Sequence, residues 1–183
     1  LSAQTGFPSF YCDDYTDRMD FFTDEWKKMG ADFDGIHSGY LAGPSQIKKV
    51  LRFLDIFQTD ASIYLADPVM GDDGRHIKAF SQELLDGMKQ LCARASITTP
   101  NLTELCLLTG TDYAALTNFA NAADYLARIS DAANRLLRTM RPNACSLITG
   151  IIRHTEDGSF MGNMAVTQDN CFYHETPYIP QSF

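Results

Sequence analysis

Short apolar segments alternate with amphipathic helical patterns along most of the chain, and this alternation constrains the fold more than any other feature. Apolar residues recur every three or four positions in five segments, which predicts helices over 19–29, 44–57, 84–92, 102–108 and 119–140. Between them lie short apolar runs that predict strands, at 34–41, 61–66, 96–99 and 144–149. This order predicts an α/β fold with a mostly parallel central sheet covered by helices on both faces. From 162 to 173 the period drops toward two, which indicates an antiparallel hairpin.

Composition narrows the class of protein. The length of 183 residues favours one domain, and 15 Lys+Arg against 23 Asp+Glu give a net charge of −8. A nucleic-acid partner is not expected, because phosphate binding needs clustered basic residues and the chain has none. No apolar run is long enough for a membrane span, and the five cysteines contain no CxxC pair. We therefore expect a cytoplasmic protein with reduced thiols and no membrane partner.

Polar or small residues follow each predicted strand. They lie at 38–40, at Asp67, at 99–101 and at 149–150. Parallel α/β sheets bind ligands at the carboxyl ends of their strands. The sequence therefore predicts an open ligand site along this edge of the sheet.

The segment 67–75, DPVMGDDGR, is the most informative of these. Asp67 leaves a buried strand, and Asp72 follows five residues later after a Pro and a Gly. Two carboxylates on one strand-end loop suit a hydrated Mg²⁺ that bridges to phosphate. The alternative is a turn in which Asp and Gly only satisfy the backbone geometry.

The segment 99–104 also allows two interpretations. Asn101 is a good helix N-cap, and Glu104 stands three residues later, where a capping-box acid belongs. The functional alternative is that both side chains face the strand-end cleft and contact metal-bound water or nucleotide phosphates. Asn101 can do both. Similarly, the segments 2–7 and 38–40 can hold a small planar ligand or be ordinary loops.

Well-known nucleotide and hydrolase motifs are missing from the sequence. It contains no GxxxxGK[ST], no GxGxxG, no GxSxG and no HExxH. Any nucleotide site must therefore be of another kind.

Four motifs, in order along the chain, resemble the ribokinase superfamily and, more closely, its pyridoxal/pyridoxine kinase branch. They are the opening SAQTGFPSFYCDDYTDRM, DPVMGDDGR at 67–75, ITTPNLTELCLLTG at 97–110 and ITGI at 148–151. FDGIHSGYL at 33–41 is similar to the branch's strand that ends in Gly-Tyr. The resemblance implies a ribokinase-like three-layer αβα sandwich that uses ATP to phosphorylate the 5′-hydroxymethyl group of pyridoxal, pyridoxine or pyridoxamine.

The resemblance also implies roles for particular residues. The pyridine ring is expected to lie beside Ser2, Thr5 and Tyr40. ATP is expected to contact Asp67, Thr99, Asn101, Glu104, Thr149 and Gly150. Mg²⁺ is expected near Asp67, Asp72 and Glu104, through water. A monovalent cation and a homodimer are further implications.

The chain departs from the family pattern at both ends. Family members carry a Gly-Thr-Gly-Asp motif whose Asp is the general base, and it would begin about where Phe183 stands. The family's first strand would likewise precede Leu1. We therefore expect one kinase domain over 1–183 that is incomplete at both ends, contains no catalytic base and is inactive alone. The alternatives are a hydroxymethylpyrimidine kinase of thiamine synthesis and a non-catalytic relic of the fold.

Overall fold

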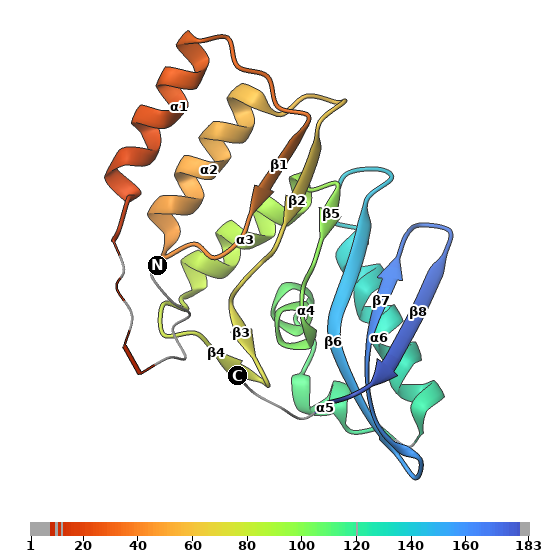
Figure 1. Cartoon of the computed structure of the whole chain (residues 1–183). Coiled ribbons are helices and arrows are strands. Elements are labelled where there is room, and N and C mark those ends of the chain that lie inside the picture. The colour runs from red at the N-terminus through yellow and green to blue at the C-terminus, as the bar shows by residue number, and fades with distance from the viewer. Residues whose placement is uncertain (1–7, 10, 12, 120, 180–183) are drawn as a thin grey trace.

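The computed structural model describes residues 8–9, 11, 13–119 and 121–179, and its centre is a six-stranded sheet (Figure 1). The strand order is β1-β2-β5-β6-β7-β8. The strands are β1 Gly35–Ser38, β2 Ile63–Ala66, β5 Ile97–Thr98, β6 Cys145–Thr155, β7 Gly158–Val166 and β8 Cys171–Pro177. A separate two-stranded hairpin consists of β3 Gly71–Asp72 and β4 Arg75–His76.

The helices connect these strands. They are the 3₁₀ turn η1 Thr16–Arg18, α1 Met19–Lys28, α2 Pro44–Phe57, α3 Gln82–Arg94, α4 Leu102–Thr109, α5 Tyr113–Thr117 and α6 Ala122–Leu137. β1, β2, β5 and β6 pair in parallel, and β6, β7 and β8 are antiparallel. The expected α/β class with a mostly parallel sheet is therefore confirmed. No helix of the described residues is long and apolar enough to cross a membrane.

The helices form one continuous layer. α1 contacts α2, α2 contacts α3, α3 contacts α4, and α4 contacts α6, while α3, α4 and α6 also contact the sheet. The physical reason is handedness: each parallel connection moves one strand to the same side, so right-handed crossovers place the connecting helices α2 to α6 on the same face, and α1 packs on α2. The expected second helical layer is not found within the part of the chain that the structure describes.

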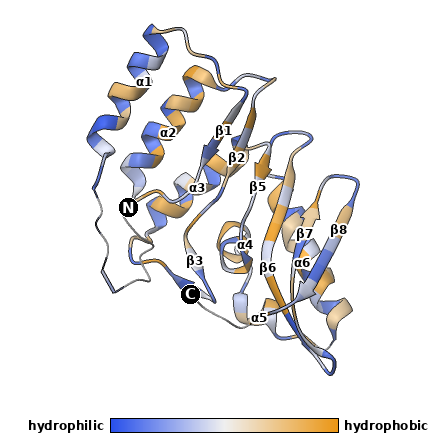
Figure 2. Ribbon diagram, viewed as in Figure 1, coloured by the Kyte–Doolittle hydropathy of each residue, from blue (hydrophilic) through white to orange (hydrophobic). Residues whose placement is uncertain are grey.

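On the opposite face of the sheet, two rows of paired neighbours are mostly apolar. One row of paired neighbours across the parallel strands consists of His37, Leu65, Ile97 and Cys145. A second row, across the antiparallel strands, consists of Leu147, Ala165 and Phe172. Phe172 is 64% exposed, and neither row contains an Asp, Glu, Lys or Arg. The two faces of the sheet therefore differ in what covers them, and Figure 2 shows that the central strands β5 and β6 are the more hydrophobic ones whereas the edge strand β8 is mostly hydrophilic.

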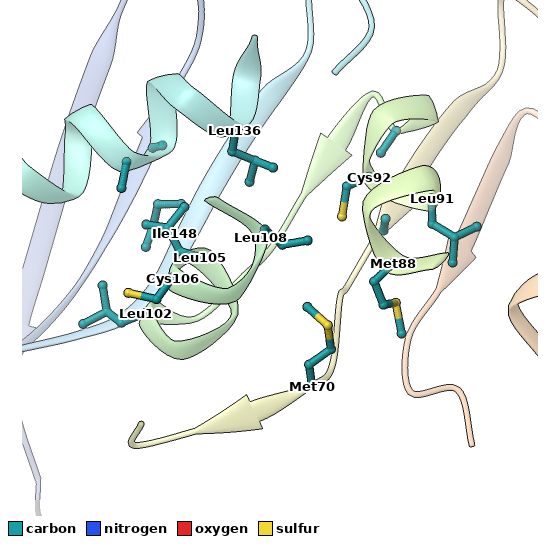
Figure 3. Packing of buried hydrophobic residues seen from close by; sticks show 14 of the residues in the cluster. Met70, Met88, Leu91, Cys92, Leu102, Leu105, Cys106, Leu108, Leu136 and Ile148 are labelled. Atoms are coloured by element: carbon teal, nitrogen blue, oxygen red, sulfur yellow. The ribbon is translucent and has the colours of Figure 1, made fainter. Parts of the chain in front are cut away.

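The core lies between the sheet and the helical layer. Met70, Met88, Leu91, Leu105 and Ile148 each expose 2% or less of their surface, and Figure 3 shows them on α3, α4 and β6 and on the loop that leads to β3. Because Met70 lies only a few residues after β2, the core holds the start of the loop that leads to the β3–β4 hairpin. The loop that follows β2 is thus anchored in the hydrophobic core through Met70.

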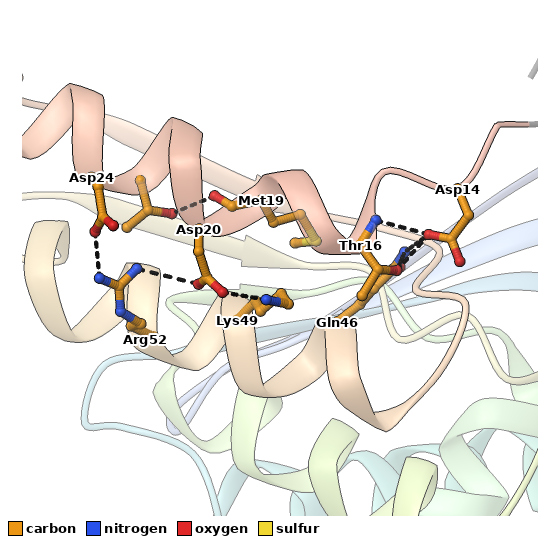
Figure 4. A network of polar contacts seen from close by, with 9 residues as sticks. Asp14, Thr16, Met19, Asp20, Asp24, Gln46, Lys49 and Arg52 are labelled. Atoms are coloured by element: carbon orange, nitrogen blue, oxygen red, sulfur yellow. Dashed lines mark hydrogen bonds and ion pairs between the residues drawn. The ribbon is translucent and has the colours of Figure 1, made fainter.

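Ion pairs join α1 to α2 at one end of the layer (Figure 4). Asp20 pairs with Lys49 and with Arg52, and Arg52 also pairs with Asp24. These contacts fix α1 against the helix that follows β1.

Several elements differ from the sequence-based predictions. The helix predicted over 119–140 begins only at Ala122, because Asn121 caps it, and Phe119 instead stacks on Tyr125 with ring centroids 4.2 Å apart. The short helix α5, capped by the Asp112 side chain, was not predicted. β6 continues past Thr149 to Thr155, so the predicted strand end at 149 is wrong.

Candidate functional site

The carboxyl ends of the parallel strands are joined by backbone hydrogen bonds. The Asp67 N–H donates to the Ser38 carbonyl over 2.8 Å, and the Thr99 N–H donates to the Ala66 carbonyl over 3.1 Å. The Thr149 N–H donates to the Pro100 carbonyl over 3.0 Å. The predicted edge is therefore a continuous strip on which the residues after each strand are neighbours.

Asp67 and Thr99 meet at the centre of this strip. The Thr99 hydroxyl donates to the Asp67 Oδ1 over 3.2 Å. Asp67 follows β2 directly and Thr99 follows β5, so this contact joins the ends of two neighbouring strands. One oxygen of the Asp67 carboxylate is therefore held by the residue that follows the neighbouring strand.

Glu104 is buried beneath the strip and completes a capping box on α4. Its Oε2 accepts the Asn101 N–H over 2.8 Å, and its Oε1 accepts the Met70 N–H over 3.1 Å. Burial raises the pKa of Glu104 to about 7, the nearby Asp67 and Asp72 charges add to the shift, and the two N–H donors oppose it. Both oxygens therefore have partners within the protein.

Asn101 serves both the helix and the loop. Its Oδ1 accepts the Glu104 N–H over 3.0 Å, which is the N-cap contact. Its Nδ2 donates to the Gly71 carbonyl over 2.8 Å. The capping interpretation is thus confirmed, and the same amide also holds the segment that contains the second acid.

The β3–β4 hairpin presents Asp72. Its two-residue loop is Asp73-Gly74, with φ of +48° and +72°, the left-handed pair that a type I′ turn requires. The Asp72 Oδ1 accepts the Asp73 N–H over 3.0 Å, and the Gly74 N–H donates to the Thr103 hydroxyl over 2.8 Å. A second acid therefore stands on a defined turn beside α4.

Thr149 and Gly150 lie at an irregularity inside β6, not at its end. The pairing of β6 with β7 shifts register between Ile148 and Ile151, and Gly150 has a φ of +67°. The Gly150 N–H donates to the Asn163 Oδ1 over 3.3 Å, and Thr149 bridges to Asn101. The bulge therefore keeps both residues at the site although the strand runs on.

Of the three residues predicted to bind the pyridine ring, the structure describes Tyr40 alone. Tyr40 follows β1 and is 55% exposed, two residues beyond the Ser38 carbonyl that holds Asp67. Its ring is accessible to a ligand from solvent. Ser2 and Thr5 lie outside the described residues.

The donor set at this edge suits a hydrated cation that is shared with a phosphate. Among the described residues, no group of three His, Cys, Asp or Glu could hold a metal ion alone. Mg²⁺ usually needs only one or two carboxylates because water and phosphate supply its other ligands. Asp67 and Asp72 fit that pattern, and Glu104 holds the loop and the start of α4 through the two N–H groups that its oxygens accept.

Sequence reasoning missed the hairpin and the residues that hold it. Asp73-Gly74 is itself a strong type I′ hairpin signal, so the hairpin could have been recognised. Thr103 and Asn163 gave no signal, because their contacts depend on how distant segments are packed. Gly71 is required because a Cβ there would overlap the Arg75 carbonyl oxygen.

Comparison with known proteins shows the family of the chain. The family model described as phosphomethylpyrimidine kinase matches residues 18–179, so the chain belongs to the phosphomethylpyrimidine kinase family. A curated relative, pyridoxal kinase PdxY of Deinococcus radiodurans, is 29% identical over 150 residues, which are 80% of this chain and 47% of the relative. A second, PdxY of Actinobacillus pleuropneumoniae, is 38% identical over 81 residues, 42% of this chain and 28% of that protein.

Solved structures share the fold. A protein from Bacteroides thetaiotaomicron described as a phosphomethylpyrimidine kinase superposes with a TM-score of 0.86 and 31% identity, covering 100% of this chain and 59% of its own. Its crystal form with pyridoxal gives 0.83 and 34%, covering 98% and 60%. This chain thus spans about half of the first curated relative and about three fifths of the solved structures. The predicted superfamily resemblance is confirmed.

Proposed function

We propose that this chain binds ATP with Mg²⁺ and takes part in phosphorylating the 5′-hydroxymethyl group of pyridoxal, pyridoxine or pyridoxamine. The observation that supports this most directly is the meeting of Asp67, Thr99 and Asn101 on one edge of the sheet, beside the hairpin that presents Asp72. Phosphoryl transfer depends on positioning and charge neutralisation more than on covalent help from the protein. Such a strip of fixed polar groups suits that task.

The residues divide the work according to their contacts. Asp67, oriented by the Thr99 hydroxyl, and Asp72, on the hairpin turn, face the phosphates and their hydrated cation. Mg²⁺, when bound, would neutralise charge on the phosphate oxygens. Glu104 positions the loop through the Met70 N–H, and Thr149 with Gly150 borders the nucleotide. Tyr40 supplies an exposed ring for the heteroaromatic substrate. We assign the general base to none of these residues.

The family description suggests hydroxymethylpyrimidine as a second candidate substrate. Phosphomethylpyrimidine kinases act, by their name, on a pyrimidine, and hydroxymethylpyrimidine is also a small heteroaromatic ring with a CH₂OH group. The pyridoxal in the Bacteroides structure and the PdxY names of the curated relatives favour the B6 vitamers. Equilibrium dialysis of pyridoxal, pyridoxamine and hydroxymethylpyrimidine against the 183-residue chain would rank the three. Tighter binding of hydroxymethylpyrimidine would reverse our assignment.

Nucleotide binding tests the first half of the proposal. Displacement of a fluorescent ATP analogue should show that ATP binds more tightly with Mg²⁺ than with EDTA. The isosteric Asp67→Asn should weaken binding by about tenfold or more, since contacts to a charged group are worth about 1.5–3 kcal/mol. The amide oxygen of the substituted side chain could still accept the Thr99 hydroxyl, so the fold is kept.

Asp60→Asn is the matched control, because Asp60 precedes β2 at the opposite end of the strand and is exposed. It should bind the analogue like the unaltered chain. Equal ATP affinity with Mg²⁺ and with EDTA, or equal effects of the two substitutions, would exclude this edge as the nucleotide site.

We further propose a cytoplasmic homodimer, on the family resemblance. Light scattering of the purified chain would measure its mass directly, and a single-chain mass at micromolar concentration would refute the dimer.

A further inference from the structure

The β3–β4 hairpin is too short to hold itself in place. Each strand has two residues, paired Gly71 with His76 and Asp72 with Arg75. An isolated two-stranded hairpin is at best marginally stable in water even when its strands are longer. The position of Asp72 must therefore be set by contacts from outside the hairpin.

Those contacts come from the first turn of α4. The Asn101 Nδ2 holds the Gly71 carbonyl, the Glu104 Oε1 holds the Met70 N–H, and the Thr103 Oγ1 accepts the Gly74 N–H over 2.8 Å. The first two act at the base of the hairpin. Of these three side chains, only Thr103 reaches the tip, where the Asp73-Gly74 turn determines how Asp72 is presented.

Thr103 is shaped for this contact. Its side chain is buried, with 3% of the residue exposed, and its methyl carbon Cγ2 would lie 3.1 Å from a Cβ placed on Gly71. At the tip, the Tyr113 ring would lie 2.9 Å from a Cβ on Gly74. Thr103 and Tyr113 thus both approach the hairpin closely, and a glycine is needed at each close approach.

Thr103 is also separate from the helix cap. Asn101 and Glu104 make the reciprocal contacts of the capping box, so substituting either one disturbs the helix and the loop together. The Thr103 hydroxyl makes its contact with Gly74 without taking part in that box. Removing the Thr103 hydroxyl therefore tests the contact at the hairpin tip without removing a contact of the capping box.

We propose that Thr103 is a positioning residue for the nucleotide site: by holding the Gly74 N–H it orients the Asp72 carboxylate toward the phosphates and their cation. This inference rests on the proposed function for its ligand. The part of the proposal in which Thr103 anchors the hairpin tip, called here the anchoring step, needs no ligand, because the hydrogen bond from the Gly74 N–H to Thr103 lies within the chain. Thr103 contacts neither substrate nor cation and acts through the hairpin.

Thr103→Val and Thr103→Ser separate the hydroxyl from the packing. Valine keeps the volume and removes the acceptor, whereas serine keeps the acceptor and removes the methyl group. Exchange of the Gly74 amide, followed by NMR, should be about tenfold faster in the valine variant and within about twofold of normal in the serine variant, as one net hydrogen bond predicts. ATP affinity at a fixed, saturating Mg²⁺ concentration should fall about five- to tenfold with valine and recover with serine.

Thr109→Val is the matched control, because Thr109 lies at the other end of α4 and donates to the Leu105 carbonyl. Gly74 exchange and ATP affinity should both stay unchanged in it. Circular dichroism of each variant checks that the helices remain.

Two results would overturn the proposal. Unchanged Gly74 exchange in Thr103→Val would refute the anchoring step, and faster exchange with unchanged ATP affinity would reduce Thr103 to a structural role. Failure of the unaltered chain to bind ATP with Mg²⁺ would instead refute the proposed function and the ligand role, while Gly74 exchange would still decide whether Thr103 anchors the tip.

Discussion

Asn101 and Gly71 are 30 positions apart in the sequence and are joined by a 2.8 Å hydrogen bond from the side-chain Nδ2 to the backbone carbonyl. The same amide caps α4 through its Oδ1. One residue therefore fixes both the start of a helix and the base of an acidic hairpin. Asparagine suits this position because it is a good N-cap that also has a side-chain donor.

Asn101→Asp should separate these two roles. Aspartate is as good an N-cap as asparagine, so α4 should remain, but it cannot donate to Gly71 and it adds charge beside Glu104. We expect ATP affinity to fall by about tenfold, the value of one lost hydrogen bond with a charge repulsion added. Analogue displacement measures the affinity, and circular dichroism measures the helix.

Asn121→Asp is the control for that change, since Asn121 caps α6 by accepting the Asp124 N–H over 3.0 Å. It should leave ATP affinity unchanged. Similar losses in the two variants would mean that the added charge matters and the contact with Gly71 does not.

Glu104 should make stability depend on pH. Its pKa of about 7 in the folded chain exceeds the ordinary 4.5, so between these values the folded state binds a proton that the unfolded state has lost. The contribution is therefore complete below about pH 4.5, decreases as pH rises, and is gone above about pH 7. A shift of this size corresponds to at most about 3 kcal/mol. Urea denaturation on either side of this window, at about pH 5 and about pH 8, measures the difference.

Glu104→Gln removes the titration while keeping an acceptor oxygen. The variant should lose less stability than the unaltered chain when the pH rises across the same window. The same decrease in both proteins would assign the pH dependence to other groups.

The fold followed from the sequence because its signals are local. The residues spaced along 44–57 predicted α2 at its observed bounds, and Asn101 with Glu104 predicted the cap of α4. The candidate residues Asp67, Thr99 and Asn101 were expected to lie together because parallel strands end on one edge, whereas their roles toward ATP rest on the family resemblance. The sequence predicted that Asp67 and Thr99 lie close together, but it did not predict the hydrogen bond between their side chains.

The remainder depended on packing between distant segments. The Thr103 contact with Gly74 spans 29 positions and leaves no periodic pattern. The bulge at Gly150 extended β6 beyond the predicted end, because a glycine with a positive φ lets the strand continue after an irregularity. The one-sided helical layer followed from strand order, which the sequence alone did not supply.

Gly71→Ala should displace the hairpin. A Cβ at this position would overlap the Arg75 carbonyl oxygen, which is backbone and cannot rotate away. We expect a loss of stability of about 1–3 kcal/mol, typical of overpacking, and an ATP affinity at least about tenfold weaker. Gly39→Ala is the control, because nothing lies within 4 Å of a Cβ there. If alanine at 71 is as harmless as at 39 in thermal melting and analogue displacement, the hairpin tolerates movement and its fixed position is unimportant.

Arg153 and Glu175 should stabilise the antiparallel part of the sheet. The Arg153 guanidinium donates through two nitrogens to the two Glu175 oxygens, one over 2.8 Å, and the Tyr173 hydroxyl donates to the same carboxylate over 2.6 Å. The Arg153 and Glu175 side chains are 15% and 23% exposed, so solvent screens this pair little. A double-mutant cycle with Arg153→Met and Glu175→Gln should give a coupling of about 1–2 kcal/mol in urea denaturation.

The coupling between Arg153 and Glu175 should also depend on pH. Arg153 lowers the pKa of Glu175. The stabilisation that the ion pair gives to the folded state should therefore be complete above the ordinary pKa of 4.5 and vanish as the pH falls through the lowered pKa. The pair Lys28–Glu25, with side chains 70% and 65% exposed, is the control and should give a much smaller coupling, because solvent screens exposed charges. Equal couplings for the two pairs would show that burial and bidentate geometry add nothing here.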